Sequence, residues 1–134
     1  MITSRNTVLV PTRVSAKAGF RVVAYSGASG VRRWSLNTDY RLPALSLGDF
    51  TPPLPAVLTR GRTLAVAGAG GTVLMRGHAD RASGAVRRLV FYGLAQWKAH
   101  RSAYAKAVKI TTPLTAAPDG SVYFGFTVTG ATPA

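Results

Sequence analysis

The chain has 134 residues, and seventeen lysine and arginine side chains against four aspartates and no glutamate give it a formal charge of +13. Its hydrophobic content of 47% argues against intrinsic disorder, and the absence of cysteine excludes disulfides, thiolate catalysis and thiolate zinc sites. No apolar run approaches the ~20 residues that span a bilayer, and the first residues lack the apolar stretch of a signal peptide, so neither a transmembrane helix nor a secretory leader is expected.

The first part of the chain predicts three antiparallel strands. Residues 7–10 form a short apolar strand that Pro11 is expected to stop, because proline lacks the N–H that a sheet ladder uses. Residues 20–25 form a second strand, which ends at the glycine-bearing turn 27–30. Residues 31–36 pair with it as a hairpin and run on toward Tyr40.

The middle of the chain predicts a proline-rich loop and then a second hairpin. Residues 42–55 hold four prolines and are expected to be irregular. Residues 56–66 and 72–78 alternate in polarity, which predicts two paired strands. Gly68, Gly70 and Gly71 lie between them and are expected to form the flexible tip of this hairpin.

The period of the pattern changes after residue 85. Apolar residues recur at three- and four-residue spacing over 86–108, which predicts one amphipathic helix with Ser83 as its N-cap. Gly93 costs such a helix about 1 kcal/mol relative to alanine. A strand over 87–92, with the helix starting near Leu94, is the alternative. The apolar stripe of the helix includes Val90, Leu94, Trp97 and Tyr104.

A turn at Asp119 and Gly120 precedes a closing strand over residues 121–129. The predicted fold is therefore α+β in a single domain, with an antiparallel sheet of about five to six strands, one long helix in the C-terminal half and a closing C-terminal strand. One helix does not cover both faces of a sheet, and its apolar stripe also needs a partner. A dimer that lays two helices across a shared sheet satisfies both requirements, and a monomer with the helix folded onto its own sheet is the alternative.

Three stretches resemble the coat proteins of single-stranded-RNA bacteriophages, in the circularly permuted form of the Acinetobacter phage. The opening Ile2-Thr3-Ser4, followed by the strand 8–10 and by Pro11-Thr12-Arg13, is similar in kind and position. The segment 95–101 resembles an Ala-x-Trp-x-x-His-basic run of that family. The closing strand 121–129 lies beyond the helix, as the permuted topology requires.

The resemblance implies a coat subunit whose sheet pairs across a two-fold axis into a continuous dimer sheet. The helices of two subunits would interlock through Val90, Leu94, Trp97 and Tyr104, and Gly68, Gly70 and Gly71 would make inter-subunit contacts around the symmetry axes of an icosahedral shell. The inner sheet face would meet packaged RNA, and the binding of an RNA hairpin would repress translation. The protein would then reside in the virion, and in the host cytoplasm during assembly.

The charge itself points to a nucleic-acid partner, because a polyanion would offset the self-repulsion of +13 and arginine contacts phosphate at two points. Strand alternation places several polar side chains in one-sided rows, which would form a basic, partly aromatic platform for phosphate contact and base stacking. A solvated face with scattered arginines is the alternative. The candidate RNA-binding residues are Arg21, Tyr25, Arg33, Asn37, Arg60, Arg62, Arg76 and His78.

No enzymatic activity, cofactor, metal, membrane or small-molecule substrate is expected. His78, Asp80 and Ser83 are close in sequence, but catalytic triads assemble across a fold and not within a short segment. Two histidines without cysteine or glutamate provide too few ligands for a typical zinc site. The alternatives to a coat subunit are a decoration, head-completion or tail protein of a tailed phage, and a basic cellular nucleic-acid-binding protein.

Overall fold

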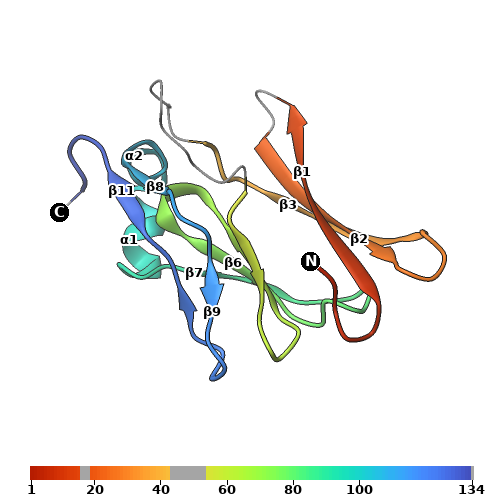
Figure 1. Ribbon diagram of the computed structural model, residues 1–134. Helices are drawn as coiled ribbons and strands as arrows, with labels where there is room; N and C mark the ends of the chain where they lie inside the picture. Colours follow the sequence, from red (N-terminus) through yellow and green to blue (C-terminus); the bar gives the residue numbers. More distant parts are fainter. Residues whose placement is uncertain (16–18, 43–53, 134) are drawn as a thin grey trace.

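The computed structural model describes residues 1–15, 19–42 and 54–133 (Figure 1). In these ranges the chain is mixed α/β, and every strand pair is antiparallel. The predicted single sheet of five or six strands is not seen, because the described strands form a three-stranded sheet, a four-stranded sheet and two two-stranded ribbons. No helix in these ranges is long and apolar enough to cross a membrane.

The first sheet consists of β1 (Thr7–Ser15), β2 (Gly19–Ser26) and β3 (Arg32–Thr38), with β2 in the middle. The predicted hairpin of β2 and β3 is confirmed, and its turn uses Gly30 at a φ of 69°. The expected stop at Pro11 is wrong. Because β1 is an edge strand of its sheet, the missing N–H of this proline is tolerated and the strand continues.

The second sheet has the order β4 (Ala56–Leu58), β5 (Leu64–Ala67), β6 (Val73–Arg76) and β7 (Val86–Leu89). The predicted strand 56–66 is two strands, because a turn closes between Thr59 and Thr63. The predicted pairing around the glycines is confirmed as the β5–β6 hairpin, joined by the short 3₁₀ turn η1 (Ala69–Gly71). Most of the predicted loop 42–55 lies outside the described residues.

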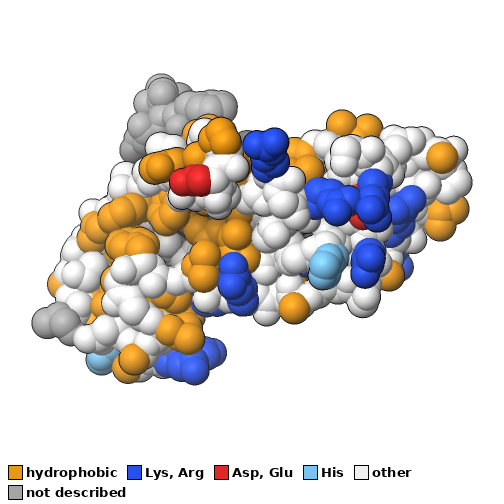
Figure 2. All heavy atoms as spheres, turned by 90° about the horizontal axis from the view of Figure 1, so that it is seen from below, with side chains coloured by type: hydrophobic (Ala, Val, Ile, Leu, Met, Phe, Trp, Pro, Cys, Tyr) orange, Lys and Arg blue, Asp and Glu red, His pale blue; other side chains and the backbone are white. Residues whose placement is uncertain are grey.

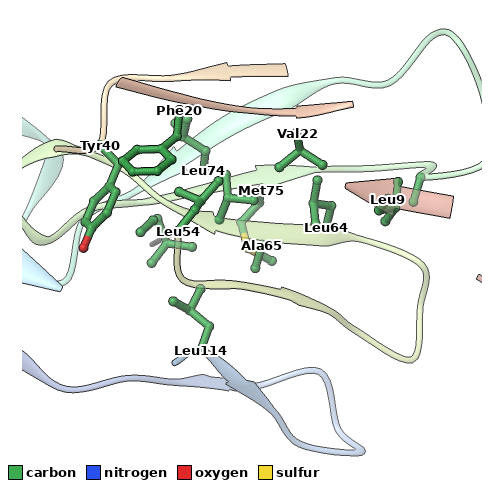
Figure 3. Close-up of a cluster of buried hydrophobic side chains, with 14 of the residues drawn as sticks. Leu9, Phe20, Val22, Tyr40, Leu54, Leu64, Ala65, Leu74, Met75 and Leu114 are labelled. Atoms are coloured by element: carbon green, nitrogen blue, oxygen red, sulfur yellow. The ribbon is translucent and has the colours of Figure 1, made fainter. Parts of the chain in front are cut away.

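The main hydrophobic core lies around the second sheet, because both faces of this sheet are covered. All four residues of β5 are fully buried. One face packs against the first sheet, where Figure 3 shows Phe20 and Val22 beside Leu64 and Leu74. The C-terminal segment covers the other face, and Leu114 from that segment enters the same core (Figure 3).

The predicted helix over 86–108 is wrong, and the alternative of a strand followed by a helix is closer to the structure. β7 comes first, followed by α1 (Leu94–Ala99), α2 (Arg101–Ala107) and β8 (Val108–Ile110). Gly93 has a φ of 101°, which no α-helix contains, and Ser83 caps nothing because a strand follows it. His100, at φ −129° and ψ 36°, separates the two helices.

The predicted closing strand is divided into β10 (Val122–Tyr123) and β11 (Phe126–Val128). β10 pairs with β9 (Thr115–Ala116), while β11 pairs with β8, so neither strand extends the two larger sheets. The turn before β10 is confirmed, because the backbone N–H of Ser121 donates to the Asp119 carboxylate at 2.8 Å.

The C-terminal segment is also joined to the first sheet through Tyr40. The side chain of this residue is almost completely buried, and its hydroxyl donates to the carbonyl oxygen of Ile110 at 2.8 Å. Burial raises the pKa of Tyr40 to about 12. The hydroxyl therefore stays protonated and keeps donating this hydrogen bond over the whole physiological pH range.

Candidate nucleic-acid interface

The residues predicted to contact RNA do not form one platform, because they belong to different parts of the fold. Arg21 and Asn37 are directly opposite each other in the β2–β3 register. Tyr25 lies on the same strand face as Arg21, four residues further along β2. Asn37 is exposed and the other two are half-buried, so these three residues do share one accessible face of the first sheet.

Arg33 belongs to a different group. The β2–β3 register shifts beside it, between Ala24 and Tyr25, which removes Arg33 from the row of Arg21. Its Nη1 donates to the Thr7 hydroxyl at 3.2 Å and to the carbonyl oxygen of Asp80 at 3.1 Å. Arg33 therefore supports the connection between β6 and β7.

Arg60, Arg62 and His78 lie on connections instead of strand faces. The two arginines are in the turn between β4 and β5, and His78 follows β6. Arg62 forms an ion pair with Asp80, Nη1 to Oδ2, at 3.9 Å. The structure thus brings Arg33, Arg62 and His78 together around Asp80, which the sequence analysis considered only as a member of a catalytic triad.

Arg76 is buried, with 3% of its surface exposed. Its guanidinium carbon lies 3.7 Å from the ring centre of Trp34, and burial lowers its pKa from the ordinary value. A guanidinium held in this way is not available to RNA, so we exclude Arg76 from the interface. Its terminal nitrogens donate hydrogen bonds of 2.9 to 3.2 Å to four backbone carbonyl oxygens, those of Gly77, His78, Arg81 and Ala82.

Asp80 holds the amino-terminal loop and the β4–β5 turn together. The Thr3 hydroxyl donates to Oδ1 of Asp80, and Arg62 approaches Oδ2. Partial burial alone would raise the pKa of Asp80. Hydrogen bonds from the hydroxyls of Thr3 and Thr7, with the positive charges of Arg62 and Arg5, outweigh this effect and hold the pKa below its usual value.

A cavity of about 210 Å³ opens beside this carboxylate. Figure 2 shows the molecule from below, with a cluster of basic side chains at one end of this face. Hydrophobic side chains cover much of the other end, where further basic side chains lie among them. We call the cavity beside Asp80 the basic cavity. Its residues are Arg5, Gly61, Arg62, His78, Asp80 and Arg81.

A second basic hollow, of about 650 Å³, lies beside the helices. Arg88 and Asp39 form its ion pair, at 2.8 Å between Nη2 and Oδ2, and Arg88 also donates to the Thr72 hydroxyl. Lys98 and Arg101 contribute further positive charge. In both hollows a single carboxylate faces several basic side chains.

The residues predicted for subunit contact pack mainly within their own chain. Trp97 and Tyr104 are buried against η1. The packing is so close that a side chain at position 70 would collide with the Trp97 ring. Gly68, Gly70 and Gly71 are themselves buried within the chain, which does not favour the inter-subunit contacts expected of them. Leu94 is exposed and Val90 half-buried, so these two keep an accessible surface.

No family model, curated protein or solved structure matches the chain. The site therefore has to be interpreted from its own geometry. Sequence reasoning missed Arg5, Arg81 and the role of Asp80. The burial of Arg76 could have been predicted from the sequence. The other residues of β6 are apolar on both faces of the strand, and an arginine in such a strand is expected to be buried.

Proposed function

We propose that the protein is a non-enzymatic coat subunit that associates with copies of itself and packages single-stranded RNA. Two features support this proposal. One is a positive charge that the fold does not neutralise, and the other is apolar surface left exposed beside an edge strand. The amino-terminal, helical and closing segments resemble RNA-phage coat proteins. This resemblance is the reason for proposing RNA as the nucleic acid and a shell as the assembly.

The unneutralised charge is the observation that carries the proposal. Even if each of the four carboxylates neutralised one basic group, thirteen positive charges would remain. Two of those carboxylates, Asp39 and Asp80, are already engaged with arginines. The excess charge lies on the folded sheets, loops and helices, and such a concentration is expected where the partner is a polyanion.

The exposed apolar surface lies beside β7, at the edge of the second sheet. Leu89, Phe91 and Phe126 have 46%, 55% and 43% of their surface exposed, and the two phenylalanine rings are 4.7 Å apart. A groove of about 410 Å³ continues this surface between β7 and the C-terminal segment. We assign subunit contact to this β7 surface, because the outer edge of β7 pairs with no other strand of the described residues and can pair with a second copy.

RNA binding is tested on protein freed of co-purified nucleic acid by nuclease and high salt. Fluorescence anisotropy with a labelled single strand of ~20 nucleotides would measure affinity across roughly 50 to 300 mM salt. We expect log affinity to fall linearly with log salt, with a slope of about −0.7 for each phosphate neutralised. Absence of binding at the lowest salt concentration would contradict the proposal, since electrostatic attraction is strongest there.

A further inference from the structure

The connection that follows β6 is unusually well fixed. Besides the four carbonyl oxygens that Arg76 holds, Nε1 of Trp34 donates to the carbonyl oxygen of Ala79 at 2.9 Å, and Arg33 donates to that of Asp80. All six carbonyl oxygens from residue 77 to residue 82 thus accept a hydrogen bond from a side chain. The backbone that carries His78, Asp80 and Arg81 is therefore held in one conformation. Ligand binding here would cost little further conformational entropy of the backbone.

Backbone strain is concentrated around the basic cavity. In the described part of the chain, three non-glycine residues adopt a left-handed conformation: Asn6 at φ 56°, Arg62 at 59° and His78 at 53°. Arg62 and His78 line the cavity, and Asn6 follows Arg5, which also lines it. Strained residues of this kind persist only where their surroundings hold them, and they cluster at binding and catalytic sites.

The charges of the basic cavity do not balance. Three arginines, Arg5, Arg62 and Arg81, line the cavity together with a single carboxylate, that of Asp80. That carboxylate also accepts from the Thr3 hydroxyl, and it meets Arg62 at 3.9 Å, which is longer than a charge-assisted hydrogen bond. One carboxylate therefore leaves an excess of positive charge around the cavity, and such an excess favours an anionic ligand.

We propose that the basic cavity binds one phosphate group through Arg5, Arg62 and Arg81. Guanidinium groups match the tetrahedral oxygens of phosphate because they donate at two points, and His78 adds a further donor or acceptor at the rim. The phosphate belongs to a nucleic-acid backbone if the proposed function is correct, or to a free phosphorylated ligand if it is not. The binding site itself does not depend on that choice.

Equilibrium dialysis with radiolabelled inorganic phosphate tests the site on full-length protein freed of nucleic acid. At about 150 mM salt, where scattered surface charges are screened, we expect one saturable phosphate per chain. Arg81→Gln and Arg5→Gln should each weaken this binding at least fivefold. Arg13→Gln, an exposed arginine on β1, makes the same charge change outside the cavity and should alter affinity less than twofold. Circular dichroism confirms that each variant is folded.

The result that would overturn the proposal is the absence of a saturable site, or equal losses in the Arg81 and Arg13 variants, since net charge alone would then explain binding. A second arm adds an unlabelled single-stranded RNA. Displacement of phosphate by this RNA would assign the site to a nucleic-acid backbone. If phosphate binds and RNA does not displace it, the site serves a free phosphate. RNA that fails to bind at all, with phosphate still bound, would contradict the proposed function and leave the phosphate site standing.

Discussion

Arg76 is a buried cation whose hydrogen bonds hold the connection 77–82. Arg76→Met keeps much of the side-chain packing against Trp34 but removes the donor from four carbonyl oxygens. The His78 oxygen still accepts from the backbone N–H of Arg81, so three of them lose the donor that Arg76 supplied without that replacement. Because a buried group left unsatisfied costs about 1–3 kcal/mol, and such costs do not add fully, we expect the free energy of unfolding to fall by about 3 kcal/mol or more. Urea denaturation followed by circular dichroism measures this change.

Arg13→Met is the matched control, because it removes the same charge from an exposed position. We expect this variant to stay within about 0.5 kcal/mol of the wild type. A loss below about 1 kcal/mol for Arg76→Met would show that the connection keeps its shape without the guanidinium.

Asp80 makes the stability of the fold depend on pH in the acid range. Its folded pKa is lowered, so its contribution is fully present above the unfolded value near 3.9 and is lost as the pH falls through the folded value. Asp119 also has a lowered pKa, from its hydrogen bonds with Ser121, so acid sensitivity as such does not identify Asp80. We expect Asp80→Asn to be less stable than the wild type at neutral pH, with the difference shrinking as the pH falls below the unfolded value and through the lower folded value.

Urea midpoints measured at several pH values test this expectation. Parallel curves for the wild type and Asp80→Asn, with the same difference at every pH, would mean that the charge of Asp80 does not stabilise the fold.

At the scale of elements, η1 and the two helices depend on close packing between Gly70 and Trp97. A Cβ at Gly70 would lie 2.4 Å from Cζ3 of Trp97, and the residue has a φ of 66°. Gly30 has a similar φ of 69° but open space around it. Both glycine-to-alanine changes incur the left-handed strain of about 1 kcal/mol, and we expect Gly70→Ala to lose a further 1–3 kcal/mol from overpacking.

Trp97→Ala should itself lower stability by about 3–5 kcal/mol, because the indole is buried. Combining Gly70→Ala with Trp97→Leu separates the two effects, since the smaller side chain makes room for the new methyl group. We expect the double variant to be more stable than the sum of the single changes predicts. Simple additivity in denaturation measurements would contradict a direct contact between residues 70 and 97.

Local patterns predicted the elements that depend on neighbouring residues. The hairpin of β2 and β3 followed from alternation around the turn 27–30, and the turn at Asp119 followed from its residue types. The helix prediction failed because three- and four-residue spacing continued through Gly93, whose positive φ is invisible to a polarity pattern. The closing strand failed in the same way, since alternation does not show where the backbone leaves its sheet.

The candidate site was predictable only in part, because it is built by contacts between distant segments. Thr3 meets Asp80 across 77 positions, and Arg33 meets it across 47. Alternation placed Arg21 and Tyr25 on one strand face, in agreement with the structure. It placed Arg33 with Asn37 as well, which is wrong, because it did not reveal the register shift that separates the two. It also gave no sign that Arg5 and Arg81 would share a cavity.

At the scale of the whole molecule, subunit association is expected to depend on the β7 surface. Leu89→Asp places a charge on this surface and should leave the protein folded but unable to assemble, since an isolated carboxylate is costly to bury. Val31→Asp is the control, because Val31 is 64% exposed in the β2–β3 turn. Sedimentation velocity would show the first variant as a small species and the second like the wild type. Identical sedimentation of Leu89→Asp and the wild type would exclude the β7 surface from subunit contact.

The coat-subunit proposal is tested most directly by size-exclusion chromatography of the protein expressed alone in bacteria, with absorbance followed at 260 and 280 nm. We predict a peak at the void volume with a nucleic-acid spectrum, which negative-stain microscopy resolves into uniform particles. A small species free of nucleic acid would contradict a self-assembling, RNA-packaging coat. It would favour an accessory protein of a tailed phage instead.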